Sequence, residues 1–262
     1  MSQDPKSKLA SNGTDFTKTS HHDTYDFSKP EQFDLEDTAV LITGASKGAG
    51  RKAPKVLSLK LDVADQSSVE KAAKDLDAAF GRLDILLNNA GYLEKFNNVA
   101  DSDPVDWWRV YEINVKGVYL CARSFIPILL KGGLKTVLNT SSIGVHVVMP
   151  GASGCQTGKL AVVRFSEFLN TEYGEQGLLS YSFHPGGVPT ERALGMPEAM
   201  HELLGDTPEL AGDSMVWLTA EKRDWLAGRY VNVEWDMKEF LEKKDKIVRG
   251  DLLKVRLDVG LE

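Results

Sequence analysis

Short apolar runs alternate with helical stretches along this chain, and the alternation restricts the folds it can form. The first run covers residues 38–43 and ends in glycines, and similar runs cover residues 83–88, 135–141, 179–184 and 229–235. A short apolar run bounded by turn residues is typical of a buried strand in a parallel sheet. We therefore predict a doubly wound α/β sheet with ligands at the carboxyl ends of its strands.

The sequence also marks the ends of two helices. Between residues 67 and 80 the apolar side chains form one stripe, Ser67 and Glu70 have the spacing of a capping box, and Gly81 is expected to stop the helix. Thr207 followed by Pro208 has the cap-then-proline order of another helix N-terminus.

Composition limits the domain count, the compartment and the partners. The 262 residues, 42% of them hydrophobic, suit one large domain over residues 37–262, preceded by a flexible polar arm over residues 1–36. A net charge of −7 disfavours nucleic acid as a partner. We expect a cytoplasmic protein, because no apolar run is long enough for a membrane span and two cysteines fit a reducing compartment. His21 and His22 have no other ligands near them in the sequence, so no metal site is predicted.

Four segments carry a resemblance to a known family. In order, they are Thr43-Gly44-Ala45-Ser46-Lys47-Gly48-Ala49-Gly50, Asn88-Asn89-Ala90-Gly91, Asn114, and Asn139-Thr140-Ser141-Ser142 ahead of Lys159. Together they closely resemble the short-chain dehydrogenase/reductase family over residues 37–233. The resemblance implies a Rossmann-like domain, a nicotinamide cofactor, and helices through which relatives form homodimers and homotetramers.

The resemblance also implies a catalytic set, but this chain departs from it at one position. In the family a tyrosine four residues before Lys159 protonates the carbonyl oxygen, whereas this chain has Cys155 there. By resemblance Ser142 holds the substrate oxygen, and Asn114 positions a water that links Lys159 to solvent. A thiol is too short to replace a phenol, because its sulfur lies roughly 4 Å closer to Cβ, more than a hydrogen-bond length.

Two interpretations of Cys155 remain open at this stage. It is either a small helix residue facing a vacated pocket or, with its thiol ionised by the nearby Lys159, a nucleophile or redox-sensitive site.

The cofactor would contact residues that follow three of the predicted strands. Glycines in the first turn let a pyrophosphate approach the backbone, so the predicted phosphate loop is Gly44, Ser46, Lys47, Gly48, Ala49 and Gly50. By resemblance, Asp62, Asn89 and Arg123 lie on the adenosine side, and Lys159, Val188 and Thr190 at the nicotinamide end. A surface salt bridge is an equal alternative for Arg123. Lys47 and Arg51 favour NADP over NAD, unless they are solvated loop charges.

One interval does not fit the family. Residues 56–63 resemble its third strand, yet only eleven residues separate Gly50 from Asp62. A full βαβ unit takes about 30 residues, so the second strand and two helices are missing. Either residues 56–63 pair irregularly beside the first strand, or the segment is shortened and the fold incomplete. We favour the shortened segment, with an altered splice boundary as the hypothesised origin.

These observations predict an NADP(H)-dependent short-chain dehydrogenase/reductase with impaired catalysis, acting on a small, apolar alcohol or carbonyl compound of secondary metabolism. The alternatives are an inactive binding or scaffold protein and a non-redox isomerase or cyclase. Three aromatic residues before Asn114, namely Trp107, Trp108 and Tyr111, are predicted to belong to the core.

Overall fold

The computed structural model describes residues 13–45 and 57–257 of the chain. Five parallel strands form one sheet in the order β1-β2-β3-β4-β5. They are β1 (Val40–Ile42), β2 (Ile85–Asn88), β3 (Thr136–Thr140), β4 (Leu179–His184) and β5 (Tyr230–Asn232), and each lies within one of the five predicted apolar runs. The predicted parallel α/β sheet is confirmed.

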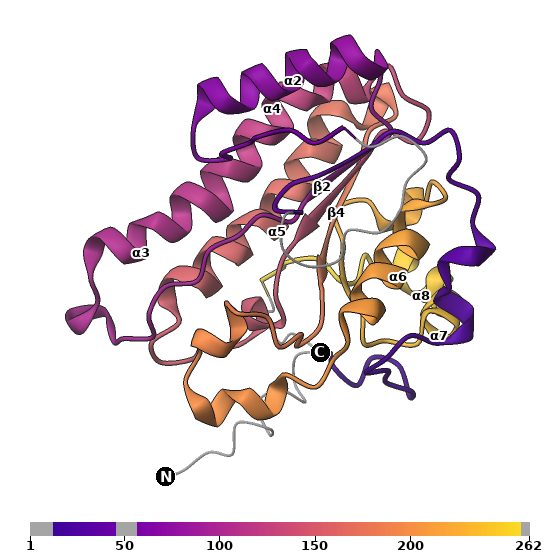
Figure 1. Ribbon diagram of the computed structural model, residues 1–262. Coiled ribbons are helices and arrows are strands. Elements are labelled where there is room, and N and C mark those ends of the chain that lie inside the picture. Colours follow the sequence, from indigo (N-terminus) through magenta and orange to yellow (C-terminus); the bar gives the residue numbers. More distant parts are fainter. Residues whose placement is uncertain (1–12, 46–56, 258–262) are drawn as a thin grey trace.

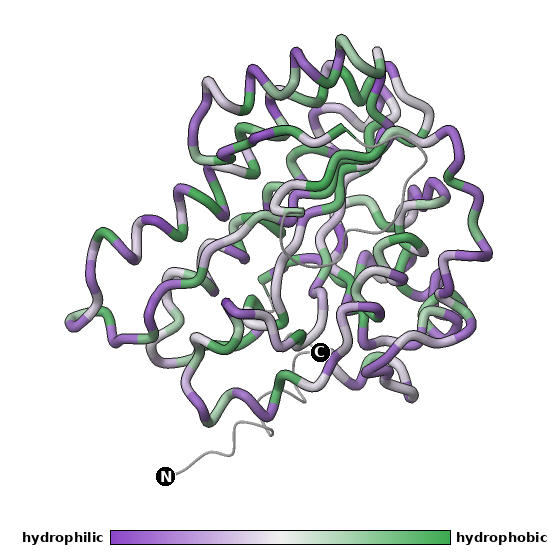
Figure 2. The backbone as a smooth tube through the Cα atoms, viewed as in Figure 1, coloured by the Kyte–Doolittle hydropathy of each residue, from purple (hydrophilic) through white to green (hydrophobic). Residues whose placement is uncertain are grey.

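Helices cover both faces of the sheet (Figure 1). Leu86 faces a core built with α2 (Gln66–Phe80), α4 (Gly117–Leu129) and α5 (Ser153–Tyr173). Ile85 and Leu87, on the opposite side of the same strand, face a core built with α6 (Pro208–Thr219), α7 (Met237–Glu242) and α8 (Lys244–Arg249). The alternation follows from the two-residue period of a strand. Figure 2 shows the strands as the most continuous hydrophobic part of the backbone.

The remaining helical segments are short and lie in the connections. They are η2 (Asp26–Ser28), η3 (Pro30–Gln32), η4 (Val99–Asp101), α3 (Pro104–Tyr111), the π-helix η5 (Glu112–Lys116), η6 (Ile143–His146), η7 (Gly174–Gln176), η8 (Ala193–Gly195), η9 (Glu198–Leu203) and η10 (Asp224–Leu226).

The predicted helix ends were correct except for one cap. Gly81 ends α2 with a φ of 69°, a conformation that favours glycine. Thr207 caps α6 by accepting a hydrogen bond from the Leu210 amide. The capping box of Ser67 and Glu70 was wrong, because Asp65 is the N-cap of α2 and accepts a hydrogen bond from the Ser67 amide. Aspartate is as strongly preferred at an N-cap as serine, so Asp65 can fill the role expected of Ser67.

The interval between β1 and β2 contains no third strand in its described part. Residues 57–63 have no strand structure, and β1 pairs directly with β2, Leu41 opposite Leu86. The strand suggested for residues 56–63 was therefore wrong from residue 57 onward, and residue 56 lies outside the described residues. Val40 and Ile42 are 42% and 37% exposed. Both observations agree with a shortened segment, since a neighbouring strand and its helix would cover β1.

Residues 13–36 run along the sheet face that α6, α7 and α8 cover, rather than away from the domain (Figure 1). The Trp235 indole donates to the Gly13 carbonyl at 2.8 Å, and the Met237 amide donates to the Tyr25 hydroxyl at 2.7 Å. His21 pairs with Asp236 at 2.8 Å. This part of the expected flexible arm thus packs onto the folded body, and residues 1–12 lie outside the described residues.

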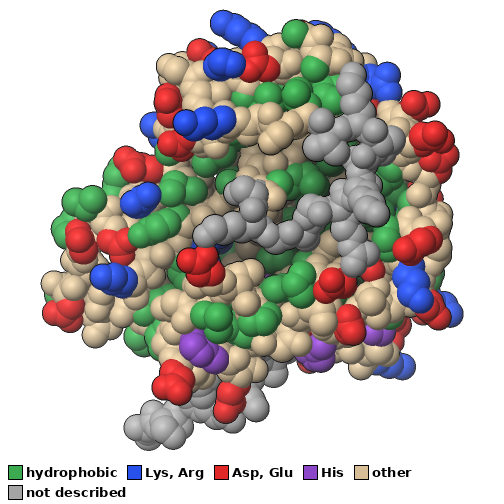
Figure 3. Space-filling model, in the orientation of Figure 1, with side chains coloured by type: hydrophobic (Ala, Val, Ile, Leu, Met, Phe, Trp, Pro, Cys, Tyr) green, Lys and Arg blue, Asp and Glu red, His purple; other side chains and the backbone are tan. Residues whose placement is uncertain are grey.

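Acidic and basic side chains are interspersed on the face shown in Figure 3. Among the described residues, no helix is both long enough and apolar enough to cross a membrane.

Candidate active site

The turns after β1 and β2 are bound together at the carboxyl edge of the sheet. The buried Thr43 hydroxyl accepts hydrogen bonds from the amides of Asn89 and Ala90, each at 3.0 Å. Gly44 follows with a φ of 69°, and a Cβ there would lie 2.9 Å from the Ala90 Cα. Only glycine fits this start of the predicted phosphate loop. The other loop residues, Ser46, Lys47, Gly48, Ala49 and Gly50, lie outside the described residues, as does Arg51.

Asn114 is buried in the π-helix η5, between α3 and α4. Its side chain makes two hydrogen bonds to the backbone of Tyr92, donating to the carbonyl at 2.8 Å and accepting from the amide at 2.7 Å. A π-helical turn often marks a functional site. Here the π-helical turn places the Asn114 side-chain amide against the segment that follows β2 and contains Gly91.

Ser142 follows β3 and caps the short helix η6. Its half-buried hydroxyl accepts a hydrogen bond from the Gly144 amide at 3.0 Å. Because accepting uses a lone pair, the O–H remains a donor suited to a substrate oxygen.

Lys159 points from α5 to the end of β3. Its Nζ donates a hydrogen bond of 2.6 Å to the Thr140 carbonyl, in the buried interior. Burial lowers the pKa of Lys159 from 10.5 to about 8; Cys155 opposes this shift and Arg192 adds to it. Desolvation disfavours the charged form of an amine.

Cys155 lies one helical turn before Lys159 on α5. Burial raises the pKa of its thiol to about 11, outweighing the lowering by Lys159. The thiol is therefore protonated near neutral pH, which argues against the ionised nucleophile and favours a small residue in a vacated pocket.

Gly91 marks the place where the site residues converge. A Cβ on Gly91 would lie 3.1 Å from Arg192 Nη1, 3.3 Å from Asn114 Oδ1 and 3.8 Å from Lys159 Nζ. Asn114 and Lys159, predicted from separate motifs, are thus brought together as expected. Arg192 was not predicted, because a single charge after Thr190 carries no signal of the direction in which it points.

Glu94 was also missed. It is 4% exposed, and its Oε1 accepts a hydrogen bond of 2.8 Å from the Cys155 amide at the start of α5. A carboxylate at this position satisfies a free N–H group and interacts favourably with the helix dipole. Its place three residues after Gly91 gave no hint of a contact with residue 155.

The remaining predicted residues fall in several places. Asp62 is exposed and accepts from the Ala64 amide at 3.0 Å. Arg123, on α4, pairs with Glu70 of α2 at 3.2 Å, which is the surface salt bridge. Val188 is half-buried after β4, and the exposed Thr190 accepts from the Ala193 amide at 3.2 Å.

The aromatic residues of α3 form a stack instead of a core. Tyr111 lies 4.9 Å from Trp107 and 5.6 Å from Trp108 between ring centroids. Trp108 is 56% exposed, so its assignment to the core was wrong. The helical spacing was interpreted as a buried stripe, whereas α3 turns this stripe partly to the surface.

Comparison with known proteins identifies close sequence relatives. The family described as enoyl-(acyl carrier protein) reductase matches residues 34–233. The short chain dehydrogenase mpl6 of Monascus purpureus is 52% identical over 224 residues, covering 86% of this chain and 76% of the relative. The short chain dehydrogenase pigC of Monascus ruber is 39% identical over 284 residues, covering 92% and 93%. The second alignment is longer than this chain, so it contains gaps where the relative has additional residues.

Solved structures share the fold. A 3-ketoacyl-(acyl-carrier-protein) reductase from Brucella melitensis, complexed with NADH, superimposes with a TM-score of 0.61 at 25% identity, covering 68% of this chain and 76% of that chain. A carbonyl reductase from chicken fatty liver, with NADPH bound, gives a TM-score of 0.59 at 21% identity, covering 69% and 76%.

Proposed function

The chain belongs to the short-chain dehydrogenase/reductase family, and from this membership we propose an NADP(H)-dependent protein that acts on a small alcohol or carbonyl compound with impaired catalysis. The convergence of Asn114 and Lys159 at Gly91 is the observation that carries the proposal. The two residues come from different elements, and the family requires them at one point.

The roles of the residues follow from their positions. A bound nicotinamide would supply or accept the hydride. Ser142 would donate its hydroxyl hydrogen bond to the substrate oxygen. Lys159 and Asn114 would orient the cofactor ribose and a water beside it, with Val188 and Thr190 at the nicotinamide end.

Cys155 is the reason for proposing impaired catalysis. A thiol is too short to reach the position of the family's phenol oxygen, so Cys155 would not donate the proton there. The loss of a general acid typically lowers a rate by about 10² to 10⁴. The short interval between Gly50 and Asp62 should impair cofactor binding as well, because it supplies fewer residues to the adenosine side of the cofactor site.

NADP is proposed from Lys47 and Arg51 in the sequence. Of the two solved structures with this fold, one is complexed with NADH and the other has NADPH bound. An apolar substrate from secondary metabolism is proposed from the likeness to fungal short chain dehydrogenases. The short interval favours an inactive binding or scaffold protein as the second candidate. The raised pKa of Cys155 weakens an isomerase or cyclase that relies on its thiolate.

A thermal melt of the purified chain with NADPH, with NADH and without cofactor tests the proposal. A single cooperative transition that NADPH raises more than NADH does would support cofactor binding. NADPH oxidation with a panel of carbonyl compounds then measures the remaining activity. A cooperative transition unmoved by either cofactor would reject the oxidoreductase and leave the scaffold.

A further inference from the structure

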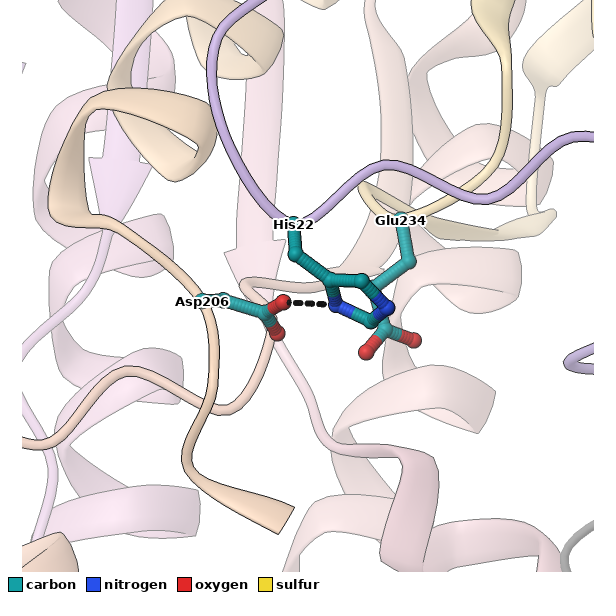
Figure 4. A group of neighbouring side chains, drawn as sticks. All are labelled: His22, Asp206 and Glu234. Carbon is teal, nitrogen blue, oxygen red and sulfur yellow. Dashed lines mark hydrogen bonds and ion pairs between the residues drawn. The ribbon is translucent and has the colours of Figure 1, made fainter.

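Three potential metal ligands from distant parts of the sequence meet beside the strand ends (Figure 4). His22 belongs to the N-terminal segment, Asp206 to the loop before α6, and Glu234 to the turn after β5. One ligand atom of each lies within 4.8 Å of the other two. His22 Nδ1 and Asp206 Oδ1 are 2.6 Å apart.

The other oxygen of each carboxylate is held by the protein. The Gly187 amide donates to Asp206 Oδ2, and the Asn232 side chain donates to Glu234 Oε2 at 2.7 Å. This leaves Asp206 Oδ1 and Glu234 Oε1 outside those two hydrogen bonds, and Asp206 Oδ1 is the atom that pairs with His22. Metal ligands are usually oriented by such outer hydrogen bonds, whereas solvated surface carboxylates are not.

The backbone fixes the same three segments. The Thr207 amide donates to the His22 carbonyl at 3.0 Å, and the His21 amide donates to the Glu234 carbonyl at 2.8 Å. These hydrogen bonds fix the backbone of the three ligand residues, so binding an ion does not require the chain to be reordered.

The charges at this place call for a cation. Asp206 is 3% exposed, and the ligand atom that Glu234 offers lies within 4.8 Å of the one that Asp206 offers. Two carboxylates at such a distance repel each other unless a proton or a metal ion lies between them. His184 is 8% exposed, and its Nδ1 has no hydrogen-bond partner among the described residues.

We propose that His22, Asp206 and Glu234 bind a divalent transition-metal ion of the Zn²⁺ type. One imidazole and two carboxylates suit Zn²⁺, whereas Mg²⁺ and Ca²⁺ take oxygen ligands. The side chain of His22 is 64% exposed, so water completes the coordination. An ion bound at His22 Nδ1 takes the place of the proton in the hydrogen bond to Asp206, and the neutral imidazole then carries its proton on Nε2. The ion fastens the N-terminal segment to the loop between β4 and α6.

Calorimetric titration of the untagged, chelator-treated full chain with Zn²⁺ tests the site. We expect one ion per chain, and binding at least about tenfold weaker in His22→Asn and Glu234→Gln. His21→Asn is the matched control, because His21 pairs with Asp236 outside the cluster, and it should bind as the wild type does. Absence of one-to-one binding by the wild type, or equal binding by Glu234→Gln, overturns the proposal.

Cobalt provides a measurement on the wild type that does not depend on the folding of a variant. Co²⁺ in this site should give visible bands of an ion bound by nitrogen and oxygen, and Zn²⁺ should displace it. A thiolate-to-cobalt charge-transfer band would assign the ion to Cys121 or Cys155 instead and overturn the proposal.

Discussion

The ammonium group of Lys159 donates a hydrogen bond of 2.6 Å to the backbone carbonyl of Thr140, joining α5 to the end of β3. By family resemblance this lysine would stand beside a tyrosine and a nicotinamide ribose. Here Cys155 occupies the tyrosine position, and its pKa of about 11 leaves no anion to pair with the ammonium. The buried charge is therefore stabilised chiefly by a carbonyl dipole.

The stability contribution of Lys159 should change with pH. Its pKa is 10.5 ordinarily and about 8 in the fold, so between these values the unfolded chain binds the additional proton. Deprotonation in the fold removes the desolvation penalty, and stability rises with pH across this window. We expect the free energy of unfolding of the wild type, relative to Lys159→Met, to increase by about 1–3 kcal/mol between pH 7 and pH 10.

Urea unfolding at several pH values measures this difference. Comparison with the variant cancels the titration of groups on which Lys159 has no electrostatic effect. A difference that stays constant from pH 7 to pH 10 would mean that the Lys159 amine is not desolvated.

Restoring the tyrosine alone should not restore reduction. Cys155→Tyr supplies the phenol, but the chain between β1 and β2 remains too short for the family's second strand and its helices. We expect no measurable NADPH oxidation by this variant, with Cys155→Phe as the control for side-chain volume. Oxidation by the tyrosine variant and not by the phenylalanine variant would show that the cofactor site is complete enough to act.

The thiol of Cys155 should react slowly at neutral pH. Burial raises its pKa to about 11, so the thiolate is a very small fraction of the molecules at pH 7. Alkylation by iodoacetamide, followed by mass spectrometry, should be at least about tenfold slower in the folded chain than in urea. Equal rates would restore Cys155 as a reactive residue.

The sequence was informative where local pattern decides the structure. The apolar runs predicted all five strands because a strand buried on both faces has a continuous signal, as residues 179–184 show. The motifs also located Asn114 and Lys159. Contacts made across the fold left no such signal: Glu94 caps a helix 61 residues away, and His22 meets Asp206 across 184 residues. The prediction that Trp108 belongs to the core failed for another reason, because helical spacing does not show which stripe of a helix faces inward.

The first glycine of the phosphate loop should tolerate no side chain. Gly44→Ala would force a residue with a Cβ into a φ of 69° and bring that Cβ within 2.9 Å of the Ala90 backbone. We expect a loss of about 1–3 kcal/mol in the free energy of unfolding. Gly205→Ala is the control, because a Cβ there would meet no atom within 4 Å. Equal stability of both variants would mean that the turn after β1 relaxes freely.

Exposed apolar side chains on α3, α4 and α5 predict association between two copies of the chain. Trp108, Tyr119 and Phe168 are 56%, 48% and 54% exposed, one on each of the three helices. Large exposed apolar side chains favour burial against a partner, and the family resemblance implies that the partner is a second copy. Phe168→Glu would place a charge in that interface and should convert a dimer to a monomer in light scattering after size exclusion. Val248→Glu, which changes an exposed apolar residue on α8, should leave the mass unchanged. A wild type that is monomeric at high concentration would contradict the prediction. A Phe168→Glu variant that remains dimeric would also contradict it, because the dimer would then form through another face.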